Sequence, residues 1–321
     1  VINCLDIFLH IQKQKGDTDM TIGSIIDNVN STRLKNWVDI LSSFHTRHTK
    51  SNNLENVVNW LNNELQKVCK DNRVLFQNFT KMDQNQTFYL KNLICKKPSI
   101  TDTENNNTII IGAHYDSRAA NLNNTKVRAP GADDNASGVS GLLELARILS
   151  SFNLNYNIEL VLFSGEEQGK WGSDFYVRGL NDFKINNNNK SNIDLYLNLD
   201  MIGYPPSSNR SNQIIIEYDV GNRYLQNDKN SKRIALLIQQ IASNYTGLQA
   251  ILNKLGNSDF IPFEALGYTV IGIHDEGEKF NPNYHKSSDT ANSLNIEYLS
   301  SVTKMALATI LTLDELNKYM N

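Results

Sequence analysis

Four separate apolar segments of this chain each lead to acidic or histidine side chains. The segments are residues 108–113, 158–165, 193–199 and 268–273, which lead respectively to His114, to Glu166 and Glu167, to Asp200, and toward His285. Parallel strands of an α/β sheet share one carboxyl edge, and ligands bind in the crevice outside that edge. We therefore expect these side chains, although distant in the sequence, to meet at one place. A fifth acidic residue, Asp134, lies in the loop over residues 130–138 and would join them there.

The remaining sequence fits a layered α/β fold. Residues 31–41 and 54–68 carry apolar side chains at helical spacing, and Ser31 is expected to cap the first of these helices. Residues 73–79 and 87–93, separated by a polar turn, indicate a β-hairpin. Further along, strands alternate with helices predicted at 138–152, 172–180, 231–244, 259–266 and 296–316. This alternation predicts a three-layer α/β/α fold with a mixed, mostly parallel central sheet.

Length and charge exclude several classes of function. At 321 residues the chain is long enough for one large α/β domain, which we place at residues 22–321 after an extension or signal-peptide remnant at 1–21. The 31 basic and 34 acidic residues give a net charge of -3, which leaves no basic field to hold a phosphate backbone. Nucleic acid is therefore not an expected partner. No run of apolar residues is long enough to predict a membrane span.

The cysteines and the asparagines bear on the cellular location. Cys4, Cys69 and Cys95 have no metal-type spacing, and we interpret them as buried or incidental thiols rather than a disulfide framework. Nine triplets of the form Asn-x-Ser/Thr favour a secreted or lysosomal glycoprotein, because most fall in polar loops. These triplets begin at Asn30, Asn78, Asn85, Asn106, Asn123, Asn135, Asn189, Asn209 and Asn244.

Two pairs of candidate residues have spacings that suit a metal site. In an extended segment residues i and i+2 point the same way, so Asp116 can reach the imidazole of His114 and fix its tautomer. Glu166 and Glu167 are adjacent, so one can bind a metal while the other faces the reacting centre. A metal lowers the pKa of bound water toward about 7, and a free carboxylate can then accept and return the proton.

Electrostatics argues that cations complete this site. If the five carboxylates of Asp116, Asp134, Glu166, Glu167 and Asp200 converge in a partly dry cleft, their mutual repulsion must be neutralised. Two divalent cations would do this, with one carboxylate bridging them through its two oxygens. A shell of mixed histidine and carboxylate ligands suits Zn²⁺ best.

Five motifs in this order resemble those of the M28 family of zinc peptidases, and in particular its co-catalytic two-zinc aminopeptidases. The motifs are H-x-D, G-A-D-D-x-A-S-G, G-E-E-x-G, N-L-D-M-x-G and Y-H-x-S-x-D-T. The resemblance also covers the lead-in Ser43-Phe44-His45-Thr46-Arg47 and extends from about Ile22 to the C-terminal helix. It implies the fold of these zinc peptidases, two zinc ions per chain, and the free N-termini of peptides or proteins as substrates.

The resemblance also implies a role for each matching residue. His114 and Asp200 would hold one zinc ion, Glu167 and His285 the other, Asp134 would bridge them, Asp116 would orient His114, and Glu166 would be the general base. A cis peptide bond is expected after the bridging aspartate, at Asp134-Asn135. The remaining histidines (His10, His45, His48 and His274) are expected to pack or lie at the surface, and Asp289 to cap the loop or helix that follows it.

The chain departs from its relatives around the substrate pocket. Residues 254–259 contain no cysteine, whereas some secreted members carry a disulfide there. Phe280 cannot donate a hydrogen bond where some members have a tyrosine, and Tyr284 is the substitute on offer. Metallo-aminopeptidase activity is the leading hypothesis. The alternatives are a glutaminyl cyclase-like acyltransferase, a carboxypeptidase or dipeptidase of the same family, and a non-catalytic binding module, which the complete ligand set disfavours.

Overall fold

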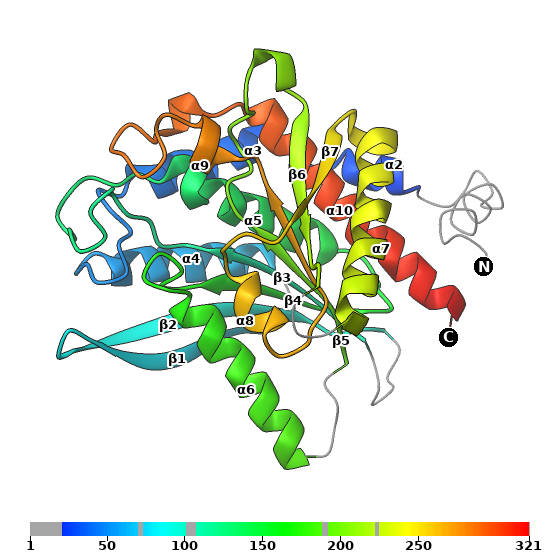
Figure 1. The fold of residues 1–321 in the computed structure, drawn as a ribbon, viewed down its shortest axis with the longest axis horizontal. Coiled ribbons are helices and arrows are strands. Elements are labelled where there is room, and N and C mark those ends of the chain that lie inside the picture. Colours follow the sequence, from blue (N-terminus) through cyan, green and yellow to red (C-terminus); the bar gives the residue numbers. More distant parts are fainter. Residues whose placement is uncertain (1–20, 70–72, 101–106, 188–191, 222–224, 321) are drawn as a thin grey trace.

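The computed structural model describes residues 21–69, 73–100, 107–187, 192–221 and 225–320. At its centre lies an eight-stranded mixed sheet with the order β1-β2-β4-β3-β5-β8-β6-β7 (Figure 1). The strands are β1 (Arg73–Asp83), β2 (Gln86–Lys97), β3 (Thr108–His114), β4 (Asn157–Phe163), β5 (Ile193–Leu199), β6 (Gln213–Tyr218), β7 (Gln249–Lys254) and β8 (Val270–His274). The predicted extension at 1–21 falls outside the described residues except for its last residue, as do Cys4 and His10.

The four strands β4, β3, β5 and β8 run parallel to one another in the middle of the sheet. The β1–β2 hairpin joins them antiparallel along β4, and at the other side β6 pairs antiparallel with β8 and parallel with β7. The predicted mixed, mostly parallel sheet is therefore confirmed. Strands β6 and β7 were not predicted, because their apolar runs, residues 214–216 and 250–252, are short.

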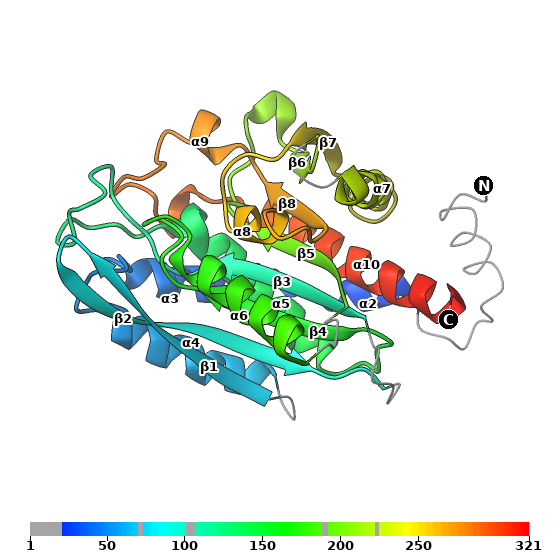
Figure 2. The same ribbon diagram turned by 60° about the horizontal axis from the view of Figure 1, so that its bottom comes forward.

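Helices cover both faces of the sheet, which confirms the predicted three layers (Figure 2). They are α2 (Ile22–Ile26), α3 (Ser31–Ser43), α4 (Leu54–Val68), α5 (Gly138–Leu149), α6 (Trp171–Asn187), α7 (Leu225–Ile241), α8 (Phe260–Glu264), α9 (Gly277–Phe280) and α10 (Ile296–Met320). The larger hydrophobic core lies under α2, α3, α4, α5, α7 and α10, and the smaller one under α6 and α8. In the described part of the chain, no helix is both long enough and apolar enough to cross a bilayer.

The first helices show how local sequence sets these elements. Helix α4 has the predicted bounds, because Leu54, Val58, Leu61 and Leu65 form a buried stripe at helical spacing. Helix α3 begins at Ser31, but its cap is the preceding residue, Asn30, whose side-chain oxygen accepts the backbone N–H of Arg33 at 2.8 Å. The prediction of a Ser31 cap is therefore wrong by one residue, since the asparagine satisfies the free N–H groups first.

Two of the three cysteines form a disulfide, contrary to the prediction of incidental thiols. Cys69 follows the last turn of α4, Cys95 lies in β2, and both side chains are buried. Their Cα atoms are 6.4 Å apart, within the range that a disulfide spans. The sequence separation of 26 residues gave no indication of this pairing, which arises because α4 packs across the hairpin.

Candidate metal centre

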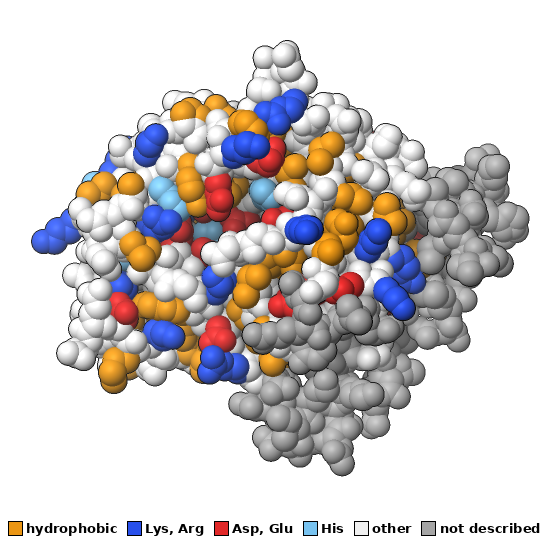
Figure 3. Space-filling view, in the orientation of Figure 1, with side chains coloured by type: hydrophobic (Ala, Val, Ile, Leu, Met, Phe, Trp, Pro, Cys, Tyr) orange, Lys and Arg blue, Asp and Glu red, His pale blue; other side chains and the backbone are white. Residues whose placement is uncertain are grey.

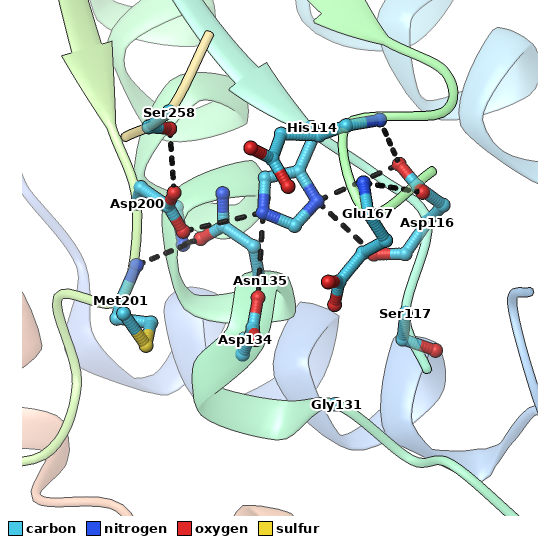
Figure 4. Close-up of polar contacts among 12 residues, drawn as sticks. His114, Asp116, Ser117, Gly131, Asp134, Asn135, Glu167, Asp200, Met201 and Ser258 are labelled. Atoms are coloured by element: carbon cyan, nitrogen blue, oxygen red, sulfur yellow. Dashed lines mark hydrogen bonds and ion pairs between the residues drawn. The ribbon is translucent and has the colours of Figure 1, made fainter. Parts of the chain in front are cut away.

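The parallel strands bring three of the predicted sites to one edge of the sheet. His114 is the last residue of β3, Glu166 and Glu167 follow β4 after a short turn, and Asp200 follows β5 directly. Strands β4, β3 and β5 are neighbours in the sheet, so their carboxyl ends lie side by side. Figure 4 shows Asp134, Glu167 and Asp200 arranged around the His114 ring.

Asp134 reaches this edge on the loop that precedes α5. The bond between Asp134 and Asn135 is cis, as the resemblance implies. The Asn135 side chain fastens the loop to the end of β5, because its Nδ2 donates to the Leu199 carbonyl at 2.9 Å and its Oδ1 accepts the N–H of Gly138 at 2.9 Å. The Asn135 side chain is fully buried. The loop therefore holds Asp134 across the sheet edge from the strand-end residues.

The Asp289 side chain forms hydrogen bonds with the backbone of this loop. The prediction that it caps the segment after it is wrong. Its carboxylate accepts the backbone N–H groups of Asp133 at 3.1 Å and of Asp134 at 3.2 Å. The short helix after Asp289 has no side-chain cap. A carboxylate that accepts adjacent backbone N–H groups sets the direction of the intervening peptide units, so Asp289 helps to orient the Asp134 side chain.

His285 arrives from the long segment after β8 and completes a second group of side chains. Its Nε2 lies 2.9 Å from Asp134 Oδ2 and 3.3 Å from Glu167 Oε2. The backbone of His285 is left-handed, with φ of 53°, a conformation that costs a non-glycine residue about 1 kcal/mol or more. The surrounding segment thus holds His285 in an unfavourable conformation that directs its ring into the cleft.

The candidate ligands form two groups that share Asp134. In the first group, His114 Nε2 lies 3.3 Å from Asp134 Oδ1 and 3.2 Å from Asp200 Oδ1. The second group consists of Asp134, Glu167 and His285. In each group one ligand atom per residue lies within 4.8 Å of the others, a spacing that suits a single ion. Asp134 faces the first group with Oδ1 and the second with Oδ2.

Two buried polar atoms support the presence of a cation in the second group. Among the described residues, none provides a hydrogen-bond partner for Glu167 Oε1 or for His285 Nε2. Buried polar atoms are seldom left without partners, because each one costs about 1 to 3 kcal/mol. Histidine nitrogens and carboxylate oxygens are the donors that Zn²⁺ takes in catalytic sites. The residues present therefore fit a pair of zinc ions.

Asp116 lies beside His114, but its carboxylate mainly holds the turn that carries the two glutamates. The Nδ1 atom of His114 is 3.2 Å from the backbone oxygen of Asp116 and 3.5 Å from its Oδ1. The same carboxylate accepts the backbone N–H groups of Gly165, Glu166 and Glu167 at 3.0 to 3.2 Å. Because residues i and i+2 of a strand point the same way, the sequence predicted that Asp116 lies near His114. Its contact with the turn could be seen only in the folded structure.

The pKa shifts reflect a cleft in which acidic groups outnumber basic ones. Burial, together with the nearby carboxylates, raises the pKa of Glu166 well above its usual value. Burial would also raise the pKa of Asp134, but the nearby imidazoles of His114 and His285 hold that pKa below its usual value. Burial opposes the charged form of His285, yet Asp134 and Glu167 raise its pKa to about 9. Without metal ions, protons on the histidines balance part of the negative charge.

Two arginines near the site were not identified from the sequence. Arg47 is fully buried and donates hydrogen bonds to the backbone oxygens of Tyr115, Leu41, Pro130 and Gly131. It thereby joins α3 to the segments that carry His114 and Asp134. Burial lowers the pKa of Arg47 to about 10. A charged residue is rarely expected in the interior, so only its place in the lead-in motif could have indicated this role.

The second arginine, Arg118, contacts a candidate ligand directly. Its Nε donates to Glu167 Oε2 at 2.7 Å, which leaves Glu167 Oε1 for another partner. The other described histidines lie outside both ligand groups. His45 is exposed and contacts the Lys126 carbonyl, and His48 is buried against the Leu122 carbonyl.

The sequence and the fold of this chain are similar to those of known peptidases. The chain is 24% identical to a probable zinc metalloprotease of Leptosphaeria maculans, over 92% of this chain and 76% of that protein. It is 30% identical to leucine aminopeptidase 2 of Trichophyton rubrum, over 60% of this chain and 39% of that protein. Its fold is similar to that of the LapA aminopeptidase of Legionella pneumophila, with a TM-score of 0.73, 20% identity, and coverage of 95% of this chain and 78% of that one. The family model for peptidase family M28 matches residues 92–310, and the chain therefore belongs to peptidase family M28.

Proposed function

We propose that this chain is a zinc aminopeptidase that binds two zinc ions and hydrolyses the N-terminal peptide bond of peptides or proteins. The observation that carries the proposal is the position of Asp134, which presents one carboxylate oxygen to each ligand group at 3.3 Å and 2.9 Å from the histidine nitrogens. A shared carboxylate of this kind is the arrangement that two nearby divalent ions require. Relatives named as a zinc metalloprotease and a leucine aminopeptidase support the zinc-dependent aminopeptidase activity.

In this proposal each side chain of the site has a separate role in the reaction. Zinc ions held by the two groups would supply Lewis-acid chemistry, polarising the scissile carbonyl and acidifying water. Glu166, which is not in either ligand group, accepts the proton of the attacking water and returns it to the leaving amine. Its raised pKa suits this role, because a carboxyl group with an ordinary pKa would hold that proton too weakly. Asp116 positions Glu166 by accepting its backbone N–H at 3.2 Å.

A tyrosine beside the second group is placed to contact the substrate. The Tyr284 ring stacks on that of His285 with 3.7 Å between the ring centres, and its hydroxyl lies 3.4 Å from Glu278 Oε1. In this proposal the Tyr284 hydroxyl turns from Glu278 to the substrate carbonyl and takes the place of the tyrosine that some members have where this chain has Phe280. The acidic cleft attracts the free α-ammonium group of a peptide, and this favours aminopeptidase action over carboxypeptidase action.

The presence of two ligand groups argues against glutaminyl cyclisation. The single-zinc relatives that catalyse that acyl transfer depart from the G-A-D-D-x-A-S-G loop, which this chain retains from Gly131 to Gly138. With Asp134, Glu167 and His285 assembled alongside His114 and Asp200, the site has ligands for two ions rather than one.

We further propose that residues 22–321 form one domain and that the protein is secreted or lysosomal and glycosylated. Of the seven sequon asparagines that the structure describes, six are exposed, namely Asn30, Asn78, Asn85, Asn123, Asn209 and Asn244, whereas Asn135 is buried in the site. Expression in a secretory host followed by enzymatic deglycosylation tests this. A mass decrease is expected, and an unchanged mass would contradict glycosylation.

The activity is tested by measuring zinc content and hydrolysis of leucine p-nitroanilide together. Two zinc ions per chain and cleavage are expected, with N-blocked substrates resistant. The variant Glu166→Gln should retain both ions while its turnover falls by about three orders of magnitude or more, because only the proton acceptor is removed. About one zinc ion and no cleavage would refute the proposal, and loss of metal in the variant would refute the role of Glu166.

A further inference from the structure

A small pocket lies next to the candidate metal centre, and Asp200 belongs to the lining of both. It encloses about 70 Å³ and lies between the ends of β5, β8 and β6 and the segment before α8. Asp200 and Ser258 line the side nearest the metal centre, and the Ser258 hydroxyl donates to Asp200 Oδ2 at 2.7 Å. Figure 3 shows acidic and histidine side chains gathered in a hollow on this face of the molecule.

The wall of this pocket contains a carboxylate that the catalytic mechanism does not use. Glu217 lies on β6, opposite Gly272 of β8, and is only 8% exposed. Its Oε1 accepts the backbone N–H of Gly256 at 2.8 Å. A methyl group in place of the hydrogen of Gly256 or Gly272 would lie 2.8 Å from a Glu217 oxygen. Two glycines therefore provide the space in which this carboxylate faces the pocket.

The nearest basic group, His274, forms an ion pair with Glu217 that is longer than a hydrogen bond; burial opposes the charged form of His274, but Glu217 raises its pKa. The His274 Nε2 atom is 3.6 Å from Glu217 Oε1, beyond hydrogen-bond distance, and His274 Nδ1 accepts the backbone N–H of Glu276 at 3.1 Å. Lys170 donates instead to Asn257 at the pocket rim, at 2.7 Å. The exposed Glu278 adds a second carboxylate to the lining. The pocket therefore has an excess of negative charge within a partly buried site.

We propose that this pocket binds the side chain of the substrate's N-terminal residue and selects lysine or arginine through an ion pair with Glu217. The inference rests on the proposed aminopeptidase function, because Asp200 joins the pocket to the metal centre where the N-terminal peptide bond would be held. Apart from the proposed metal ligand Asp200, the two carboxylates of the lining, Glu217 and Glu278, outnumber its one histidine. A cationic side chain would balance the remaining charge, whereas an apolar side chain would displace water from Glu217 without replacing its hydrogen bonds.

The variant Glu217→Gln separates charge recognition from a purely structural role. Glutamine keeps a side-chain oxygen that can accept the Gly256 N–H, so the neighbouring segment keeps its support. Only the negative charge is lost. Glu278→Gln is the matched control, because it removes an exposed carboxylate from the same lining, where solvent screens the charge.

The test compares lysine and norleucine p-nitroanilides, whose side chains have the same carbon chain and differ by the ammonium group. The wild-type protein should favour lysine by about tenfold or more in kcat/KM, as a charge-assisted contact of about 1.5 to 3 kcal/mol implies. Glu217→Gln should remove this preference, mainly through KM, and leave norleucine within about threefold. Glu278→Gln should change the preference by about threefold or less.

Inhibition of the wild-type protein by lysinamide and norleucinamide provides a measurement that does not depend on any variant. Lysinamide should inhibit more strongly. If norleucine is preferred as substrate and inhibitor, or if Glu217→Gln affects both substrates equally, the role of Glu217 is refuted while the aminopeptidase function stands. If the zinc-loaded protein cleaves no aminoacyl anilide, the aminopeptidase function itself fails, and the inference fails with it.

Discussion

The two ligand groups differ in what holds their side chains in place. His114 and Asp200 lie at the ends of β3 and β5, where the sheet continues past them: the N–H of Tyr115 donates to Phe163 and that of Asp200 to Ile273. In the second group, Glu167 lies on a turn whose backbone N–H groups donate to Asp116. His285 lies on the long segment that follows β8 in the sequence and belongs to no strand. The sheet thus fixes the first group, whereas hydrogen bonds to individual side chains fix the second.

This difference predicts an order of metal affinity. The second group has a left-handed residue, His285, and an arginine 2.7 Å from one of its carboxylate oxygens. The arginine opposes a cation there through like charge, whereas the strained backbone of His285 is already present without the cation. The His114 group should therefore take up zinc first and more tightly than the His285 group.

The largest effect is expected from Asp134, the residue that both groups share. Asp134→Ala should remove both zinc ions and the stabilisation that they provide, because each group loses a ligand. Asp200→Ala and His285→Ala should each remove one ion, and the ion that stays in His285→Ala should be the tighter one. Zinc content by mass spectrometry and the zinc-induced rise in Tm measure these outcomes. Two ions in Asp134→Ala would refute the shared site.

A smaller effect is expected from Asp289, which supports Asp134 from outside the ligand set. Asp289→Asn should weaken zinc binding by about tenfold to a hundredfold, because one of the two accepting oxygens becomes an NH2 group that cannot accept and the remaining oxygen carries no charge. Asp314→Asn is the matched control. Asp314 is also a buried carboxylate that accepts two backbone N–H groups, those of Asn155 and Tyr156, away from the site.

Calorimetric titration with zinc compares the two variants. The control should lose stability without a change in zinc affinity larger than about twofold. Equal losses of affinity in both variants would mean that Asp289 acts through general stability and not through the Asp134 loop.

The contrast between the groups also explains what the sequence could predict. Long apolar runs marked β3, β4 and β5, and their parallel arrangement followed from alternation with helices, so the positions of His114 and Asp200 followed as well. His285 was tied to the site by the motif resemblance, since β8 ends at His274 and a long segment intervenes. Contacts with single backbone groups, as made by Asp116 and Asp289, depend on turn geometry that no local pattern encodes.

Other features escaped prediction because they run against common tendencies. Arg47 is a fully buried charge, which residue type alone makes improbable. Glu217 lies on β6, a strand that was not predicted. Gly272 leaves space for its side chain only because β6 pairs with β8. The bond between Cys69 and Cys95 depends on the packing of α4 against the hairpin. Each of these features is set by tertiary contacts and not by periodicity.

The smallest expected effect is a change in proton release with pH. In the metal-free protein Asp134 and Glu167 raise the pKa of His285 to about 9, despite the opposing effect of burial. The contribution of this contact to stability is therefore complete below the ordinary pKa of 6.5 and is lost as the pH rises through about 9. Zinc needs the neutral imidazole, so binding at about pH 7 should release close to one proton from His285.

Titration calorimetry in buffers of different ionisation enthalpy measures that proton. The pKa of His114 is also raised, because burial is outweighed by Asp200 and the other carboxylates, so the first group should release a proton too. His285→Gln should abolish the weaker step together with its proton while the tighter step keeps its own, and in the wild-type protein the proton of the weaker step should disappear above about pH 9. If the weaker step in the wild-type protein released no proton at about pH 7, His285 would already be neutral before zinc arrives. The carboxylates of the second group would then have to be balanced by Arg118 rather than by the histidine, and the two groups would differ in charge as well as in support.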